Sequence, residues 1–481
     1  MNGCPPRRHR AGPIAAPPPR VRVARGRFGV SATRRPPPPG PRGHPLVGSL
    51  PEFRRDILGF LTQCAREYGD VVAFRVFHIR CCLVNHPDLI EQVLVREQDR
   101  TIKNWDARQL KVALGDGLLT NEGDAWRGQR RLIQPAFHND AIRRYAEIMV
   151  RNTGRMLASW RDGEVRDLQT DLMAVTLEIV AEALFGVDLA PQSRLIGPAL
   201  GDVMEWFERV FTGGLPLPLW IPTPANLKMR RAIGRFDALV SSFIRQRRAS
   251  PVRGSDLLTS LLAATDEAGA GMTDRQLRDE VMTLLLAGHE TTALALSWAL
   301  YLVGQHPEVE AKLMGEIDTV LGDRVPTADD VSRLGYARQV MQEAMRLYPP
   351  AWGIGREARA PIELGDFVVH PGTQIFLVQW VTHRDPRFFP EPERFLPERW
   401  EPEAERRIPK YAYFPFGGGP RYCVGSNFAM METVLLLTMM VQRFRFRLQA
   451  PRAVQLQAAV TLRPRHGIRA TVLRRHSLTP A

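Results

Sequence analysis

Cysteine is scarce in this chain, and its few thiols are unevenly placed. The 481 residues contain five, namely Cys4, Cys64, Cys81, Cys82 and Cys423. An odd number without regular spacing argues against a disulfide framework, and no C-x-x-C pair indicates a zinc site. We therefore expect a protein of a reducing compartment, the cytoplasm.

Long apolar runs are also missing. None reaches the roughly 18 residues that a membrane-spanning helix needs, and the N-terminus lacks the apolar core of a secretory signal. The richest run, Thr433 to Val441, has the length of a helix buried in a protein core. The sequence thus predicts a globular protein without a transmembrane segment.

Acidic residues are absent from the first 49 positions, which contain ten arginines. Of the formal net charge of +14, the rest of the chain therefore carries only +4 (14 − 10), and we expect no nucleic-acid partner. Residues 1–47 are rich in proline and arginine and cannot bury enough apolar surface to fold. We expect a disordered tail or an over-extended gene start there, with a basic arm that contacts lipid or a partner as the less favoured alternative.

Helical patterns dominate the remainder, residues 48–481, which we expect to form one large domain. Helices are predicted between Pro87 and Tyr348, and short β-like runs at Val71–Phe77, Cys81–Asn85, Ile362–Val378 and Val454–Val472. The expected fold class is mainly α with small β-sheets.

One predicted helix carries a polar cluster inside an apolar surface. Thr273 and Gln276 stand in capping-box register at its start, and it should end near Gly304 and Pro307. Its sides are apolar nearly all round, as in a helix at the centre of a large protein. Its middle nevertheless holds the polar run Gly288–Thr292.

Two interpretations of this cluster remain open from the residues alone. The small residues Ala287 and Gly288 would let a flat ligand lie against the helix, beside an acid, Glu290, and a hydroxyl, Thr291, that deliver protons. Alternatively, the cluster marks a kink in which a threonine bonds to the preceding turn.

The stretch FPFGGGPRYCVG, residues 414–425, places Cys423 directly after a glycine-rich loop. Backbone N–H groups of such a loop stabilise a thiolate, and Arg421 could bind an anionic group bidentately. A thiolate on a loop that leads into an apolar helix suits a soft ligand to iron. A cysteine nucleophile would need a His and Asn or Asp constellation, which this stretch lacks.

Four segments together resemble the cytochrome P450 monooxygenases. The haem-loop pattern F-G-x-G-x-R-x-C-x-G is met by Phe416, Gly417, Gly419, Arg421, Cys423 and Gly425. The pattern A-G-x-[DE]-T-T is met by Ala287, Gly288, Glu290, Thr291 and Thr292. E-x-x-R is met by Glu343 and Arg346, and F-x-P-E-R-[FW] by Phe395, Pro397, Glu398, Arg399 and Trp400. The resemblance covers roughly residues 36–470 and implies the cytochrome P450 fold with haem b (iron protoporphyrin IX).

The resemblance also implies roles for single residues. Cys423 would ligate the haem iron, with Phe416 and Gly417 in the surrounding loop. Arg421, Arg130, Trp126 and Arg356 would bind the haem, the arginines through its propionates. Glu343, Arg346 and Arg399 would form a buried structural cluster, Glu290 and Thr291 would deliver protons to dioxygen, and His383 would be structural.

The implied activity is the hydroxylation of a hydrophobic molecule with O2. Electrons would come from a separate ferredoxin or flavodoxin with its reductase. Residues 201–227 stand where relatives have an access lid, and the candidate pocket residues are Ala287, Ala351, Trp352, Val460 and Thr461. The resemblance favours a terpenoid or carotenoid and a fatty acid equally, while plain core packing would also explain the apolar lid.

Other functions stay open beside this one. A non-catalytic haem-binding or gas-sensing protein would keep Cys423 and Arg421 but would have no need of Glu290 and Thr291. An isomerase or dehydratase on the same fold usually has a disrupted distal helix, whereas the pattern here is intact.

Overall fold

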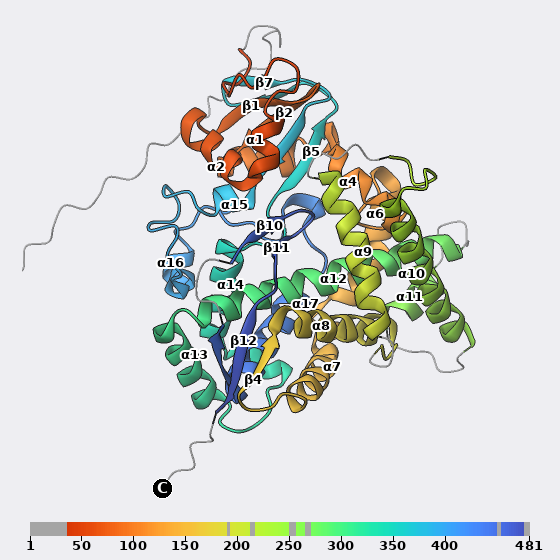
Figure 1. The fold of residues 1–481 in the computed structure, drawn as a ribbon, viewed down its shortest axis with the longest axis vertical. Helices are drawn as coiled ribbons and strands as arrows, with labels where there is room; N and C mark the ends of the chain where they lie inside the picture. Colours follow the sequence, from red (N-terminus) through yellow and green to blue (C-terminus); the bar gives the residue numbers. More distant parts are fainter. Residues whose placement is uncertain are drawn as a thin grey trace, which may run out of the picture.

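The structure is a computed structural model that describes residues 36–189, 193–211, 217–249, 256–264, 271–449 and 454–475. Helices crowd around one long central helix, α12, and a mixed sheet lies at one end of the molecule (Figure 1). The helices are α1 (Leu50–Arg55), α2 (Ile57–Tyr68), α3 (Pro87–Glu91), α4 (Trp105–Gln109), α5 (Lys111–Leu114), α6 (Gly123–Ile133), α7 (Asn139–Ala158), α8 (Leu168–Phe185), α9 (Ser193–Phe211), α10 (Pro224–Ala249), α11 (Leu257–Ala263), α12 (Asp274–Val303), α13 (Pro307–Val320), α14 (Gly335–Leu347), α15 (Gln379–Thr382), α16 (Pro402–Glu405) and α17 (Ser426–Arg443).

The strands are β1 (Val71–Val76), β2 (Ile79–Val84), β3 (Thr101–Lys103), β4 (Glu164–Asp167), β5 (Ile354–Ala358), β6 (Ile362–Leu364), β7 (Phe367–Val369), β8 (Gln374–Leu377), β9 (Phe444–Leu448), β10 (Leu456–Ala458), β11 (Leu462–Pro464) and β12 (Arg469–Arg474). The fold is mainly α with small sheets, as predicted. The helical region expected from Pro87 to Tyr348 is interrupted by β3 and β4, and the second β region begins earlier than Ile362 because β5 precedes it.

The central helix forms as the sequence indicates. The Thr273 hydroxyl accepts a hydrogen bond from the Gln276 N–H while the Gln276 side chain accepts one from the Thr273 N–H, so the predicted capping box is present. α12 continues without interruption to Val303 and packs against α8, α10, α14 and α17. The run from Thr433 to Val441 lies in α17 and is buried, also as predicted.

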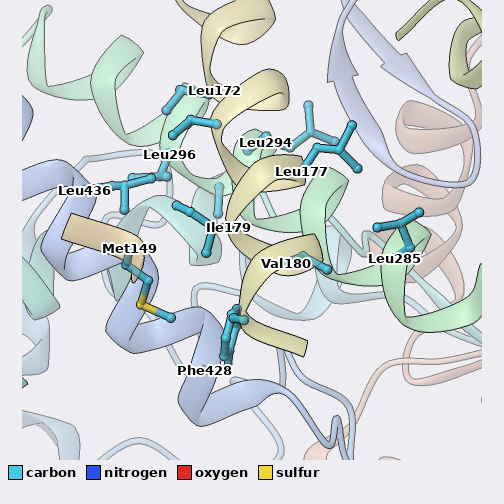
Figure 2. Packing of buried hydrophobic residues seen from close by; sticks show 14 of the residues in the cluster. Met149, Leu172, Leu177, Ile179, Val180, Leu285, Leu294, Leu296, Phe428 and Leu436 are labelled. Carbon is cyan, nitrogen blue, oxygen red and sulfur yellow. The ribbon is translucent and has the colours of Figure 1, made fainter. Parts of the chain in front are cut away.

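The core between these helices is dense. Figure 2 shows apolar side chains of α7, α8, α12 and α17 packed together, among them Met149, Leu172, Leu177, Ile179, Val180, Leu285, Leu294, Leu296, Phe428 and Leu436. Each fully buried side chain of this size stabilises the fold by about 1.5–3 kcal/mol. The core therefore holds α12 and α17 in a fixed relation to each other.

Gly288 belongs to this packing. A Cβ atom built on it would lie 3.1 Å from Cγ2 of Val180, so that its missing side chain lets α8 approach α12 closely. The expectation that Gly288 makes room for a flat ligand is therefore not supported by its surroundings. Ala287, the other small residue of the pair, is exposed on a different side of the helix.

The main sheet joins distant parts of the chain. Its five strands have the order β1-β2-β8-β5-β3; β2 and β8 run parallel and the other pairs antiparallel. The parallel pair places Cys81 beside Gln374. At the C-terminal end, β10 and β11 form the predicted hairpin, and β12 pairs with β9 and β4 in a separate sheet.

The ordered body begins before residue 48. The Pro39 carbonyl accepts a hydrogen bond of 2.8 Å from the Ala73 N–H, and the Val47 carbonyl accepts one of 3.0 Å from Phe77. The Arg75 guanidinium donates to the carbonyls of residues 44, 45 and 46. Because these bonds tie residues 36–47 to β1, the predicted boundary at residue 47 is too late, while residues 1–35 lie outside the described part. No helix among the described residues is long and apolar enough to cross a membrane.

Candidate active site

The glycine-rich loop before α17 presents Cys423. The Cys423 N–H donates to the Phe416 carbonyl at 3.0 Å, and the Gly417 N–H donates to the Phe414 carbonyl at 2.9 Å. Gly417 and Gly419 have φ values of 74° and 65°, which side-chain-bearing residues rarely adopt. A Cβ at Gly419 would also lie 2.1 Å from the Leu94 carbonyl oxygen. The loop conformation thus requires glycine at this position.

The Cys423 thiol combines exposure with dense surroundings. The residue is exposed, yet burial among protein atoms raises the pKa of its thiol. The Gly425 N–H and the Arg130 guanidinium act in the opposite direction and favour the thiolate. The thiol is thus accessible and lies next to N–H groups at the start of a helix. In this position it can bind, as a thiolate, the metal ion of a metal-containing ligand.

One face of α12 is also open. Ala287 is exposed and Thr291 is half-buried, although most residues of α12 around them are buried. The two stand four residues apart on one face of the helix. The Thr291 hydroxyl donates to the Ala287 carbonyl at 2.7 Å, and the Thr292 hydroxyl donates to the Gly288 carbonyl at 2.9 Å. The back-bonded threonine considered from the sequence is therefore present, in a helix that stays continuous.

Glu290 is held away from Thr291. Its side chain is buried, at 2% exposure, and Oε1 accepts a hydrogen bond of 2.6 Å from the Thr461 hydroxyl and one of 2.8 Å from Nε of Arg463. Arg463 also forms an ion pair with Glu290 through Nη2. The sequence reasoning missed Arg463, although a buried carboxylate in an apolar helix requires a cationic partner.

Cations gather beside the cysteine loop. Arg421 donates to the Asn121 carbonyl at 3.0 Å, forms an ion pair with Glu122, and lies 4.2 Å from the ring centre of Trp126. One turn further along α6, the Arg130 guanidinium donates to the Tyr422 carbonyl at 2.8 Å.

Two more cations stand opposite each other on β3 and β5. Lys103 pairs in register with Arg356, and neither forms an ion pair within the described part of the chain. Burial, with Arg421 nearby, lowers the pKa of Arg356 to about 10. Burial, followed by the charges of Arg421 and Arg356, lowers the pKa of Lys103 to about 7. The sequence reasoning found Arg356 but missed Lys103, which carries no motif.

The charge balance of this cluster fits a haem. Lys103, Arg130, Arg356 and Arg421 are basic side chains of this cluster, and Glu122 is the acid that forms an ion pair with Arg421. The basic side chains outnumber the acid, and this excess of positive charge suits the two negative propionates of a haem. Cys423 offers a sulfur atom, a donor that haem iron accepts. Together with the exposed face of α12, these residues form surroundings that suit a haem.

The expected structural cluster is assembled below the loop. Two bonds of 2.8 Å join the Arg346 guanidinium to the Glu343 carboxylate, and both side chains are fully buried. Arg399 donates to Glu343 at 3.2 Å. The His383 carbonyl accepts from Arg346, while Nε2 of its ring accepts from the Phe414 N–H at 3.0 Å. The cluster thereby supports the start of the cysteine loop.

The predicted pocket residues fall in different places. A cavity of about 1260 Å³ between α1, α2, β2 and the β10–β11 hairpin is lined by Trp352 and Val460 among others. A smaller cavity of about 140 Å³ is lined by Val460 and Thr461. Ala287 and Ala351 line neither cavity.

The expected access lid is divided between α9, α10 and the segment between them. Residues 212–216 lie outside the described part. Val210 of α9 lines the large cavity, while Val203, Trp206 and Phe207 are buried in the core. Core packing therefore accounts for part of this apolar segment, while the lid stays a prediction.

A cysteine on a glycine loop, an open face of a central helix and a surplus of cations beside them define a protein that binds haem through a thiolate. The profile of the cytochrome P450 family matches residues 38–468, and the chain belongs to that family.

Known proteins agree with this assignment. The chain is 39% identical over 411 residues to cyclooctatin synthase of Streptomyces melanosporofaciens, which covers 85% of this chain and 89% of that protein. It is 37% identical over 418 residues to cyclooctat-9-en-7-ol 5-monooxygenase of the same organism, with 85% and 89% covered. The solved structure of retinoic acid bound cyanobacterial CYP120A1 matches with a TM-score of 0.81 and 28% identity over 92% of this chain and 100% of that chain. The chain is a haem monooxygenase of hydrophobic substrates.

Proposed function

We propose that this cytochrome P450 hydroxylates a terpenoid, using haem b and electrons from a ferredoxin or flavodoxin with its reductase, in the cytoplasm. The Cys423 loop and the open face of α12 carry the chemical part of this proposal. The relatives support the choice of substrate, because cyclooctat-9-en-7-ol and retinoic acid, which appear in their names, are isoprenoid compounds. A terpenoid is therefore preferred to a fatty acid.

Part of the large cavity has walls that suit such a substrate. Its walls include the aromatic side chains Phe53, Phe376 and Trp352 and the aliphatic tip of the β10–β11 hairpin. The Trp352 indole N–H donates to the Ala459 carbonyl at 2.8 Å, so that its ring is fixed between the cavity and the hairpin. Other parts of the lining are charged, for example at Arg54, so a bulky hydrocarbon skeleton would lie against the aromatic and aliphatic part.

In the proposed mechanism, the bound haem supplies the activation of dioxygen, with one oxygen atom going to a C–H bond and the other leaving as water. Cys423 provides the thiolate ligand. Arg130, Arg356, Arg421 and Lys103 would hold the propionates, and Trp126 keeps Arg421 in place through its ring. The surrounding loop positions Phe416 and Gly417 against the same group.

Residues of α12 handle protons. The Thr291 hydroxyl donates to the Ala287 carbonyl and keeps its lone pairs available for a further hydrogen bond on the open side of the helix. Glu290, whose carboxylate is held toward Thr461 and Arg463, would replace a proton given up there through intervening water. Glu343, Arg346 and Arg399 act only through the loop that they support.

The first test is spectroscopic. The purified full chain is reduced, exposed to carbon monoxide and scanned. We expect a strongly red-shifted Soret band, which a Cys423→Ala variant loses; a Soret band typical of histidine ligation would contradict the assignment of Cys423.

The substrate is tested separately by adding all-trans-retinoic acid, a cyclic diterpene alcohol or lauric acid to the haem-loaded protein, with a plant ferredoxin, its reductase and NADPH. We expect oxygenated products from the isoprenoid compounds. Products from lauric acid alone would refute the preference for a terpenoid.

A further inference from the structure

Glu290 is bound at one oxygen only. The bonds from Thr461 and Arg463 all end on Oε1, and within the described part of the chain Oε2 accepts none. Nε of Arg463 also donates to the Thr461 hydroxyl at 3.1 Å, so that the three side chains form a closed triangle. The carboxylate is thus anchored through Oε1, the oxygen that the Thr461 hydroxyl contacts directly.

The strand that holds Glu290 is itself fixed. The Leu462 N–H donates to the Pro350 carbonyl at 2.9 Å, and the Trp298 indole N–H of α12 donates to the Leu462 carbonyl at 3.0 Å. Thr461 and Arg463 flank Leu462, and side chains two apart on an extended chain share one face. This geometry brings both side chains to the same carboxylate.

The same two side chains also border solvent. Thr461 and Arg463 line the cavity of about 140 Å³ between α9 and the β10–β11 hairpin. That volume holds several water molecules, and its walls offer polar groups to bind them. Its α9 side includes Gly201 and Glu205, and the Glu205 side chain is 42% exposed. The cavity therefore extends from the protein surface to the two groups that bind Glu290.

His289 does not supply this proton. It lies beside Glu290 and Arg463, but burial lowers the pKa of its imidazole. Its Nδ1 lies 2.8 Å from the Leu285 carbonyl oxygen, and its buried Nε2 has no hydrogen-bond partner within the described residues. A neutral imidazole that does not contact water cannot regain a proton from solvent after it has donated one.

We propose that the cavity between α9 and the β10–β11 hairpin is the proton entrance of the enzyme, in which the Thr461 hydroxyl passes protons to Glu290 and Arg463 is the positioning residue. A water in the cavity donates a proton to the Thr461 oxygen while the Thr461 hydroxyl gives its own proton to Oε1 of Glu290. The hydroxide left behind is neutralised by exchange with bulk solvent, so the net change is one proton taken from solvent by one carboxylate. This inference rests on the proposed role of Glu290.

The cavity can be closed without touching Glu290. A Cβ on Gly201 would meet nothing within 4 Å, so Gly201→Leu places a side chain into the open space. Gly197 lies one turn earlier on α9, does not line the cavity and also faces open space, so Gly197→Leu is the matched control. Thr461→Val removes the hydroxyl at nearly constant shape, and Thr461→Ser restores it.

The experiment uses the haem-loaded full chain with a plant ferredoxin, its reductase, NADPH and the isoprenoid compound that the wild type oxygenates fastest. Product and hydrogen peroxide are measured per NADPH in H2O and in D2O. We expect Gly201→Leu and Thr461→Val to lower product per NADPH about tenfold, as for a lost proton donor, and to raise the solvent isotope effect. Gly197→Leu and Thr461→Ser should behave like the wild type.

A second measurement does not depend on turnover. A crystal structure of the haem-loaded wild type should show ordered water within hydrogen-bond distance of the Thr461 hydroxyl, and that of Gly201→Leu should not. A dry cavity, or unchanged coupling and isotope effects in both test variants, would overturn the proton entrance while leaving the monooxygenase intact. Absence of any oxygenated product in the wild type would instead refute the proposed substrate class, and the water structure would then decide the entrance alone.

Discussion

Lys103 is the residue whose replacement tests the charge balance of the haem site most directly. Its side chain is 8% exposed, and its backbone N–H donates to Glu122 at 2.7 Å. Burial, followed by the charges of Arg421 and Arg356, lowers its pKa from the ordinary 10.5 to about 7, against the opposing effect of Glu122. In the haem-free protein the Lys103 amine therefore binds its proton weakly.

The size of the effect follows from linkage. The pKa falls by about 3.5 (10.5 − 7), and about 1.4 kcal/mol for each pH unit gives a cost of about 5 kcal/mol. The unfolded chain keeps the proton up to pH 10.5 and the folded haem-free chain only up to about 7. The cost is thus fully present below pH 7, and stability rises as the pH increases from 7 to 10.5.

Two propionates would supply the missing negative charge, so haem binding should recharge Lys103. Binding of Cys423 as a thiolate releases the proton of its thiol in every variant, so Lys103 is isolated by a difference. At pH 8.5, addition of haem to the haem-free protein in weak buffer with an indicator dye should take up about one proton per haem more in the wild type than in Lys103→Met. Lys111→Met, at an exposed lysine of α5, should match the wild type. Equal uptake by wild type and Lys103→Met would refute the reasoning.

Three further predictions concern the framework of the site. Glu343→Gln should lower the free energy of unfolding in urea by about 3–5 kcal/mol, because the Arg346 charge would stay buried without its partner; unchanged stability would contradict the role of this pair. Gly419→Ala should yield protein with little haem, because φ is 65° and Leu94 leaves no room. Gly128→Ala, which faces open space, should keep full haem content by absorbance, and equal content in both would show that the loop tolerates a side chain. Burial raises the pKa of Glu280 from 4.5 to about 7, so the folded state holds a proton that the unfolded state has lost between these values. Stability should therefore fall as the pH rises from 4.5 to 7, by about 3 kcal/mol (7 − 4.5 = 2.5 pH units). Urea midpoints at pH 5 and pH 8 measure this fall, and a Glu280→Gln variant with the same fall would show that another group causes it.

Local signals in the sequence predicted the parts of the site that are local in the chain. The capping box of α12, the glycines with positive φ before Cys423 and the Glu343–Arg346 pair each lie within a few residues, where spacing decides the geometry. The boundary of the ordered body was missed because it depends on Arg75, which binds carbonyls about 30 residues earlier.

By itself, the sequence determined the thiolate loop, the central helix and the family to which they belong, because these features rest on short-range backbone geometry and on residue type. Only the tertiary structure decided which charges meet. Arg463 reaches Glu290 across 173 positions, and Arg421 reaches Glu122 across 299. The strand pairing of β3 with β5 sets Lys103 beside Arg356. Such pairs form because a buried charge must find its partner in space, wherever in the chain that partner stands.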